Sequence, residues 1–227
     1  HHRFLHSFPT RRSSDLERAL KAIAGYLALA PSLTAFGNTN PTSYFRLVPH
    51  QEAPTNICWG DRNRSVLVRV PLGWGEGAVR MVCDANPGEQ PAAIDTSLKQ
   101  TVEFRCPDGS ADIYLLLAGL AVAARHGFEM ENGIQYARDR YVDVNIFDDR
   151  HKEVLARLSQ LPASCEESAR QLEAQRAVYE QYGVFPPRLI DGVIARLAGF
   201  HDAELREACA RDEVRIRELV RTWFYCG

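Results

Sequence analysis

The sequence lacks two features that would assign it to a large class of proteins. It has no excess of positive charge, because 27 Lys and Arg residues face 29 Asp and Glu residues and the net charge is −2. Proteins that bind nucleic acid usually carry a clear basic excess, so we expect no nucleic-acid partner. The longest apolar run, residues 113–124, is shorter than the ~20 residues that a membrane span requires. We therefore expect a buried helix there and no association with a membrane.

Closely spaced cysteine pairs are also absent. The six cysteines are scattered and none forms a C-x-x-C pair, which argues against a zinc ribbon or a dithiol redox motif. Scattered cysteines are typical of free thiols in a reducing compartment, so we predict a cytoplasmic protein. The composition, with 45% hydrophobic and 25% charged residues, is that of an ordinary globular chain.

The first 16 residues need separate treatment. The stretch FPTRRSSDL, residues 8–16, resembles one reading frame of a common sequencing-library adapter. We predict that residues 1–16 are foreign to the natural protein and leave them out of the fold prediction, as we would a tag. The alternative is a genuine basic tail. If the segment is foreign, we expect the chain to be the C-terminal part of a longer protein, which an independently amplified gene would show.

The first half of the remaining chain carries one helix signal and several strand signals. Residues 17–30 have apolar side chains at helical spacing, and the turn-forming residues of 31–43 predict that this helix ends at Pro31. Segments rich in valine, isoleucine, phenylalanine and tryptophan then predict four strands, at residues 56–60, 65–74, 78–84 and 100–106.

The second half reads as helical. Asp108 or Ser110 could cap a helix that contains the apolar run. Beyond about residue 148, apolar and charged residues recur at helical spacing, with breaks at Pro162, Gly183 and residues 186–187. This pattern predicts three or four amphipathic helices whose charged faces are in solvent.

The segment from residue 44 to residue 71 combines strand-forming residues with fixed positive charge. On a regular strand Arg62 and Arg64 would point to one side and Arg69 to the other. A bulge or a contact from a neighbouring segment would therefore be needed to bring them to one ligand. The segment contains four arginines and a single glutamate, which are Arg46, Arg62, Arg64, Arg69 and Glu52.

A second charged pattern lies on the predicted strand at residues 100–106. Glu103 and Arg105 share one face of that strand, while Val102 and Phe104 share the other and can pack inward. A carboxylate suits a hard divalent cation, and arginine suits carboxylate or phosphate groups. The spacing alone is also compatible with a structural Glu–Arg pair, so these residues leave both interpretations open.

Three stretches together resemble glutamine synthetase. They are SYFRLVPHQEAP (residues 43–54), RNRSVLVRVP (62–71) and VEFRCPDGSADIYLLLAGL (102–120). The family has N-S-Y-x-R-L-V-P-x-x-E-A-P, R-N-R-S-x-x-x-R-x-P and E-x-R-x-x-D-x-x-A-N-P-Y-L in the same order and at matching spacing. The agreement extends over most of residues 22–137, so it is far more specific than one short motif.

The resemblance implies an α+β fold in which an antiparallel β-sheet forms part of the glutamine synthetase catalytic barrel, with flanking helices and a helical C-terminal region. Residues 17–137 would belong to the core of this catalytic domain and residues 138–227 to its C-terminal helices. The implied reaction is the ATP-dependent ligation of ammonia to glutamate through γ-glutamyl phosphate, with Mg²⁺ or Mn²⁺. The family forms homo-oligomeric rings in which neighbouring subunits share each site.

The family's functional residues carry over by position. Glu52 would be the catalytic glutamate that closes over the site and takes a proton from ammonium. The others would be binding residues: Arg46 and Arg105 for the substrate, Arg64 and Arg69 for the ATP phosphates, and Glu103 for the metal. Such a set fits the chemistry, because phosphoryl transfer depends on positioning and on electrostatic stabilisation of anionic oxygens.

Some positions depart from the family pattern. Thr101 stands where the family has a phosphate-binding arginine, with Lys99 nearby, and Asp112 and Ile113 replace the asparagine and proline of N-P-Y-L. The family's small N-terminal domain and its upstream metal-ligand glutamates have no counterpart here. We therefore expect this chain alone to be inactive.

Two other functions remain open. A related ligase could join glutamate to an amine larger than ammonia with the same glutamate and phosphate contacts. A non-catalytic module could use the arginines to bind nucleotides or other anions without a divalent metal.

Overall fold

The computed structural model describes residues 13–48, 53–71, 76–88, 101–209 and 212–223. Within these ranges the three strands are β1 (Trp59–Asp61), β2 (Val68–Val70) and β3 (Glu103–Phe104). The longer helices are α1 (Ser13–Gly37), α3 (Glu76–Ala85), α4 (Ile113–Glu129), α7 (Cys165–Glu180), α8 (Pro187–Ala198) and α10 (Glu213–Trp223). The short helices are α2 (Ser43–Arg46), α5 (Gly133–Asp139), η2 (Asp149–His151), α6 (Lys152–Ala156), η3 (Gln181–Gly183) and α9 (Leu205–Cys209).

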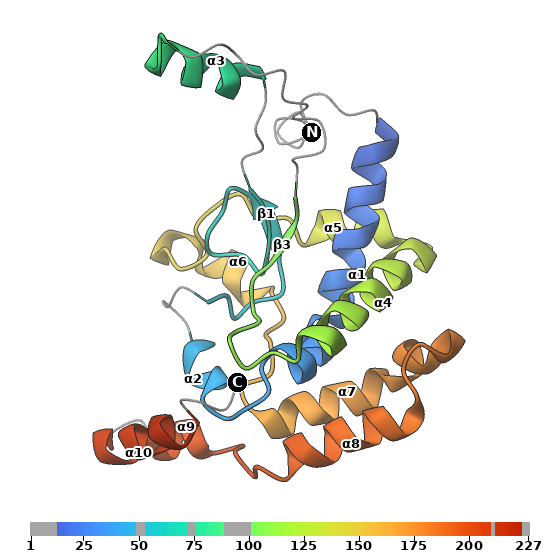
Figure 1. Cartoon of the computed structure of the whole chain (residues 1–227), viewed down its shortest axis with the longest axis vertical. Helices are drawn as coiled ribbons and strands as arrows, with labels where there is room; N and C mark the ends of the chain where they lie inside the picture. Colours follow the sequence, from blue (N-terminus) through green and yellow to red (C-terminus); the bar gives the residue numbers. More distant parts are fainter. Residues whose placement is uncertain (1–12, 49–52, 72–75, 89–100, 210–211, 224–227) are drawn as a thin grey trace.

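Helix α1 is the central element of the core. It packs against α4, α5 and α7, and it crosses behind α4 in Figure 1. Its apolar side chains Ile23, Leu27, Leu33 and Phe36 are at most 1% exposed. Each buried side chain of this size contributes about 1.5–3 kcal/mol to the free energy of unfolding. The helix begins at Ser13, inside the segment predicted to be foreign, and the boundary at residue 16 stays a prediction.

Helix α1 is also long and apolar enough to cross a membrane over Leu16–Gly37. However, 67% of the apolar stretch that meets this criterion is buried by the rest of the chain, as in the core helix of a globular domain. Helices α4 and α5 pass the same test only as a pair bent by 107°. Length and composition therefore do not tell a membrane-spanning helix from a buried core helix, but the packing of α1 against α4, α5 and α7 is that of a core helix.

The predicted end of the first helix at Pro31 is wrong. Helix α1 continues through Pro31 to Gly37. A proline inside a helix costs about 3 kcal/mol, but Leu33 and Phe36 beyond it are completely buried and offset that cost. Two hydroxyls of this turn also bond to α7: Ser32 Oγ lies 2.7 Å from Tyr179 Oη, and Thr34 Oγ1 lies 2.6 Å from Ser168 Oγ.

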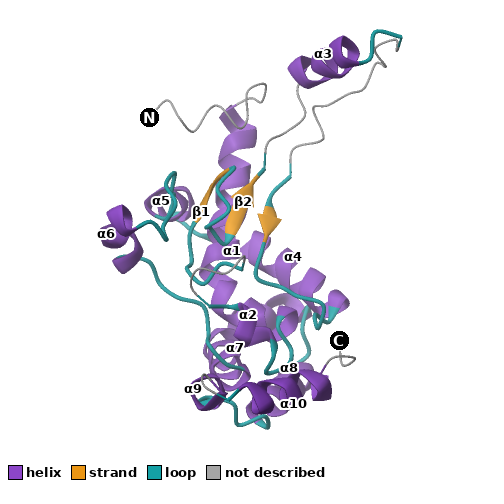
Figure 2. Ribbon diagram, turned by 90° about the vertical axis from the view of Figure 1, so that its left-hand side faces the viewer, coloured by secondary structure: helices purple, strands orange, loops and turns teal. Residues whose placement is uncertain are grey.

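The sheet is mixed, so the antiparallel arrangement is only partly confirmed. Strands β2 and β3 are antiparallel, with Arg69 opposite Glu103, whereas β1 and β2 are parallel, with Gly60 opposite Arg69. Parallel strands usually need a connection of a dozen or more residues. Here the short turn 62–67 returns the chain to the start of β1, an arrangement that strand propensities do not reveal. Figure 2 shows the three strands side by side, next to α1.

The strand predicted at residues 78–84 is also wrong, because these residues lie in helix α3. The apolar positions Ala78, Met81 and Val82 follow the i, i+3, i+4 spacing of a helix, which the valine content obscured. Helix α3 stands away from the rest of the chain in Figures 1 and 2, and Met81 is 73% exposed.

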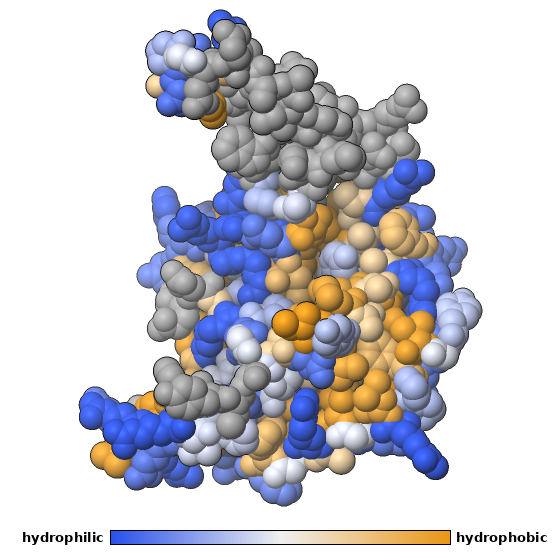
Figure 3. All heavy atoms as spheres, viewed as in Figure 1, coloured by the Kyte–Doolittle hydropathy of each residue, from blue (hydrophilic) through white to orange (hydrophobic). Residues whose placement is uncertain are grey.

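Helix α4 confirms that the apolar run is helical, but the expected burial is only partial, since the buried residues of α4 are Gly119, Val122, Ala123 and Gly127. The cap is Asp112, whose Oδ1 accepts a hydrogen bond from Leu115 N at 3.0 Å. Asp108 instead accepts from Ser110 N within the preceding turn, at 2.9 Å. The start of α4 exposes Ile113, Tyr114 and Leu117, and Figure 3 shows hydrophobic surface on this side of the molecule.

The helices expected after residue 148 are present. Helix α7 packs against α8, and Asp202, 4% exposed, accepts hydrogen bonds from the first two amides of α7, Cys165 N at 2.9 Å and Glu166 N at 3.0 Å. These bonds satisfy amides that a helix cannot pair internally.

A smaller apolar cluster packs against the turn 62–67 and consists of Cys58, Val66, Val142 and Ile146.

Candidate functional site

The turn 62–67 brings together arginines that a regular strand would separate. Arg62 and Arg64 lie in this turn and not on a strand. The turn starts with Arg62 at a positive φ of 54°, a conformation that few residues other than glycine adopt. Arg64 therefore lies on the same side of the sheet as Arg69, although the alternation of a regular strand would have placed the two side chains on opposite sides.

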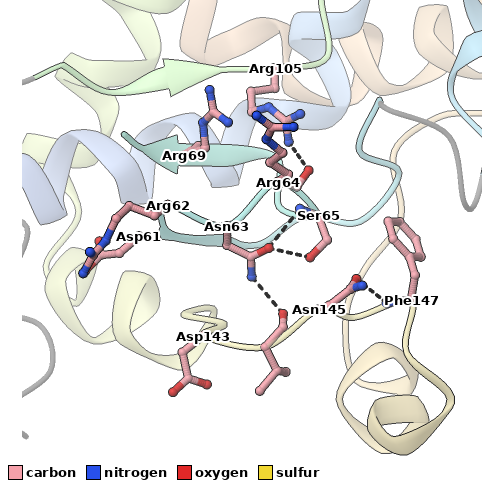
Figure 4. Close-up of a pocket in the computed structure, with 11 residues that line it drawn as sticks. Asp61, Arg62, Asn63, Arg64, Ser65, Arg69, Arg105, Asp143, Asn145 and Phe147 are labelled. Carbon is pink, nitrogen blue, oxygen red and sulfur yellow. Dashed lines mark hydrogen bonds between the residues drawn. The ribbon is translucent and has the colours of Figure 1, made fainter. Parts of the chain in front are cut away.

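A cavity of about 740 Å³ opens beside this turn. Figure 4 shows Arg64, Arg69 and Arg105 next to one another on one wall, while Arg62 extends away from them. The opposite wall consists of residues 143–145 and Phe147. The volume is within the range of pockets that hold small molecules, and basic side chains outnumber acidic ones in the lining. The cavity therefore suits an anion.

The backbone of the turn orients Arg105. Its Nη1 donates hydrogen bonds to the carbonyl oxygens of Arg64 and Val66, the latter at 2.9 Å. Partial burial lowers the pKa of Arg105, and the nearby charge of Arg69 lowers it further, with smaller contributions from Arg64 and Arg46. Guanidinium groups this close repel one another, so an anion bound among them would relieve the repulsion.

Glu103 is paired with Arg69. Nε of Arg69 donates to Oε2 of Glu103 at 2.8 Å, and Nη2 forms an ion pair with the same oxygen at 2.7 Å. The two residues face each other across β2 and β3. The side chains are 24% and 37% exposed, so solvent weakens the pair. The structural Glu–Arg pair considered from the sequence exists, but its arginine is Arg69 and not Arg105.

Arg46 does not line the cavity. Its Nη2 donates to the carbonyl oxygens of Cys106 and Pro107, at 2.8 and 2.7 Å, so it holds the chain that leaves β3. The charge of Arg46 still contributes to lowering the pKa of Arg105. Its Nε is buried without a partner in the described part of the chain.

Two of the sequence-predicted positions lie outside the described residues. These are Glu52, the expected catalytic residue, and Lys99, the candidate replacement for a phosphate-binding arginine. Thr101 is described and exposed, two residues before Glu103. The roles of Glu52, Lys99 and Thr101 therefore stay predictions.

Sequence reasoning missed the second wall of the cavity. Asp143, Asn145 and Phe147 belong to a segment with no motif of its own. It reaches β1 because Gly60 lets the backbone approach: a Cβ at Gly60 would lie 2.2 Å from the carbonyl oxygen of Val142. The glycine two residues before R-N-R-S was the one available signal of such a close approach.

The described residues could supply one ligand to a divalent metal, but not a complete site. No group of three or more His, Cys, Asp or Glu residues gathers within the described ranges. Glu103 has Oε1 left for another contact, since Arg69 occupies Oε2. Mg²⁺ is commonly held by one or two carboxylates together with phosphate oxygens and water, so Glu103 fits as one such ligand.

Among the described residues, those that line the cavity include no cysteine. Cys58 lies under the turn, and burial raises its pKa to about 12. The thiol therefore stays protonated at neutral pH. Burial likewise raises the pKa of Cys106, next to Arg105 in the sequence. The arrangement suits anion binding and phosphoryl transfer more than covalent catalysis by the protein.

Comparison with known proteins identifies the family. The family model described as "Glutamine synthetase, catalytic domain" matches residues 9–197 of the chain. The curated glutamine synthetase of Thermococcus kodakarensis is 36% identical over 177 residues, which are 77% of this chain and 34% of that protein. The chain belongs to the glutamine synthetase family. The resemblance predicted from its three motifs is thus confirmed.

Other glutamine synthetases agree with this assignment. Those of Pyrococcus furiosus and Streptomyces coelicolor are 36% and 35% identical over 172 and 169 residues, in each case 74% of this chain. They are matched over 32% and 31% of their own length. The chain therefore spans about a third of the length of these glutamine synthetases.

Solved structures share the fold. One described as "GmaS/ADP complex-Conformation 1" has a TM-score of 0.54 and 23% identity, and the match covers 91% of this chain and 40% of that one. Another, described as "Apo GmaS without ligand", has a TM-score of 0.53 and 24% identity, with coverage of 92% and 39%. The α+β architecture predicted from the glutamine synthetase resemblance is therefore confirmed.

Proposed function

We propose that this chain supplies the phosphate-binding wall of the ATP site in a ligase that joins ammonia to glutamate. The observation that carries the proposal is the convergence of Arg64, Arg69 and Arg105 on one cavity. Membership of the glutamine synthetase family supplies the reaction class. The three guanidinium groups match the charge and the hydrogen-bonding geometry of phosphate oxygens.

In this reaction the γ-carboxylate of glutamate attacks the terminal phosphorus of ATP and forms γ-glutamyl phosphate and ADP. Ammonia then attacks the acyl carbon, and inorganic phosphate leaves with the bonding electron pair. Arg64 and Arg69 hold the phosphate oxygens, and Arg105 holds the phosphorylated substrate. The positive charges of these arginines stabilise negative charge during the transfer.

The remaining roles follow the carry-over from the family. Glu103 would be one ligand of a Mg²⁺ or Mn²⁺ ion, and that ion would neutralise the part of the phosphate charge that the arginines do not. Glu52 deprotonates ammonium and closes the site against water, which would otherwise hydrolyse the acyl phosphate. By the same carry-over Arg46 would bind the carboxylate of glutamate.

We also propose that copies of the complete protein assemble into a ring in the cytoplasm. Ile113, Tyr114 and Leu117 of α4 are 65%, 86% and 60% exposed, an apolar surface of the kind that protein contacts cover. Light scattering of a protein of the relatives' length that contains this chain is expected to give the mass of several copies. The mass of a single copy would contradict the ring.

Isothermal titration of the chain with ATP tests the proposed function. We expect binding that weakens at least about tenfold when EDTA removes Mg²⁺, because the metal offsets the repulsion between Glu103 and the phosphates. Absence of ATP binding would overturn the proposal. Binding that is indifferent to the metal would instead favour the non-catalytic anion-binding module.

An experiment that identifies the amine acceptor requires a catalytically complete protein. A hybrid in which this chain replaces the matching segment of the Thermococcus kodakarensis glutamine synthetase should release ADP only with glutamate and ammonia together. Faster ADP release with methylamine or a polyamine than with ammonia would identify the glutamate–amine ligase.

A further inference from the structure

The side chain of Asn63 ties the two walls of the cavity together. Its Nδ2 donates to the carbonyl oxygens of Val142 and Val144, at 3.2 and 2.8 Å, on the wall opposite the arginines. Its Oδ1 accepts from the N and the Oγ of Ser65, at 2.9 and 2.7 Å, within the arginine-bearing turn. Figure 4 shows Asn63 between the two segments. All hydrogen-bonding groups of the amide are thereby used.

Ser65 extends this tie by one further bond. Its Oγ accepts from Ile146 N at 3.4 Å, while its own hydroxyl hydrogen goes to Asn63. Ser65 is buried, so these bonds are protected from water. Together the two residues connect the turn to the opposite wall through side-chain bonds at three backbone positions, Val142, Val144 and Ile146.

The tie acts on Arg64, which lies in the turn, and on Arg105, which is hydrogen-bonded to the turn. Arg64 lies between Asn63 and Ser65 in the chain, so its Cα position follows theirs. Arg105 depends on the same turn, because its Nη1 donates to the carbonyl oxygens of Arg64 and Val66. A shift of the turn would move these acceptors and with them the guanidinium group of Arg105. Small displacements of binding groups are costly, since a shift of about 1 Å can reduce a rate by about 100-fold.

We propose that Asn63 is a positioning residue: it holds Arg64 and Arg105 at the spacing that a chain of phosphates requires, without touching the phosphates itself. This inference rests on the proposed function for its ligand, and on the hydrogen bonds above for its mechanism. Asn63, the asparagine of R-N-R-S, thus has a structural role that could not be inferred from its being a polar residue.

The test compares ATP and AMP binding by the full chain and by Asn63→Ala. We expect the Kd for ATP to rise about tenfold while the Kd for AMP changes less than about threefold, since AMP has a single phosphate to align. The milder variant Ser65→Ala loses the two bonds of the Ser65 hydroxyl but keeps both bonds from Asn63 to the opposite wall, so it should weaken ATP binding in the same direction by about threefold. Equal losses for ATP and AMP would indicate general destabilisation and would overturn the proposal.

Asn145→Ala is the matched control. Asn145 lines the same cavity, but the bond of its Oδ1 goes to Phe147 N in its own segment, at 3.1 Å. This variant should leave the ratio of ATP to AMP affinity unchanged. A fall in that ratio as large as in Asn63→Ala would show that any asparagine of the cavity has the same effect, and would contradict a specific tie.

A second measurement separates this inference from the proposed function. The Nε–Hε nuclear magnetic resonance signal of Arg105, recorded without ligand, should report an ordered side chain in the wild type and in Asn145→Ala, and a mobile one in Asn63→Ala. If the wild type does not bind ATP, the proposed function fails and this signal alone decides the inference. An equally ordered Arg105 in Asn63→Ala would refute it.

Discussion

Gly127→Ala is expected to destabilise the fold by about 3 kcal/mol, because it forces an extra methyl group between two closely packed helices. Gly127 is buried on α4, where it crosses α1. A Cβ at this position would lie 2.0 Å from the carbonyl oxygen of Lys21 and 2.6 Å from the amide nitrogen of Gly25. Both atoms belong to the backbone of α1, so no side-chain rotation can relieve the clash and the two helices must separate.

Gly192→Ala is the matched control for this substitution. Gly192 is an exposed residue inside α8, and a Cβ there meets no atom within 4 Å. Alanine should therefore stabilise α8 by about 0.5–1 kcal/mol, because glycine is a poor helix former. Urea unfolding followed by circular dichroism measures both variants. An unfolding free energy of Gly127→Ala within 1 kcal/mol of the wild type would contradict the close crossing of α1 and α4.

Arg105→Ala is expected to raise the Kd for ATP by about 100-fold, in a titration with Mg²⁺ present. The substitution removes a partly buried charge from the centre of the arginine wall. Hydrogen bonds to charged groups contribute about 1.5–3 kcal/mol each, which corresponds to a factor of about 10 to 100 in affinity. The variant also leaves the carbonyl oxygens of Arg64 and Val66 without their donor, so the turn itself should loosen.

Arg170→Ala controls for the loss of one positive charge. Arg170 pairs with Glu166 on α7, is 60% exposed and is not among the residues that line the cavity. Its removal should change the Kd for ATP less than about twofold, because exposed charges at a distance are screened by salt. If Arg105→Ala and Arg170→Ala weaken ATP binding equally, net charge rather than the arginine wall determines affinity.

Much of the candidate site could be predicted because its charged residues occur in the same order and at the same spacing as in the motifs of the glutamine synthetase family. Arg64, Arg69, Glu103 and Arg105 were chosen from the sequence, and the structure brings them to one region. How they meet could not be predicted, since a strand would place Arg64 and Arg69 on opposite faces. The positive φ of Arg62 starts the turn that resolves this conflict, and no propensity indicates a positive φ at an arginine.

Two of the errors in the fold arise because local rules ignore contacts with the rest of the chain, and the third, at residues 78–84, is a wrong choice between two local patterns. Pro31 should end a helix, but the burial of Leu33 and Phe36 extends α1 beyond it. Valine content suggested a strand at residues 78–84, while the spacing of the apolar positions there is helical. The parallel pairing of β1 and β2 depends on a turn of six residues held by Asn63, a tertiary contact that periodicity does not contain.

The most direct test of the account is a crystal structure of the chain with a non-hydrolysable ATP analogue and Mg²⁺. We predict phosphate oxygens within hydrogen-bonding distance of the guanidinium groups of Arg64 and Arg69, with Arg105 beside the terminal phosphate and Asn63 still bonded to Val144. An analogue bound elsewhere on the chain, with the arginine wall in contact only with water, would contradict the central claim.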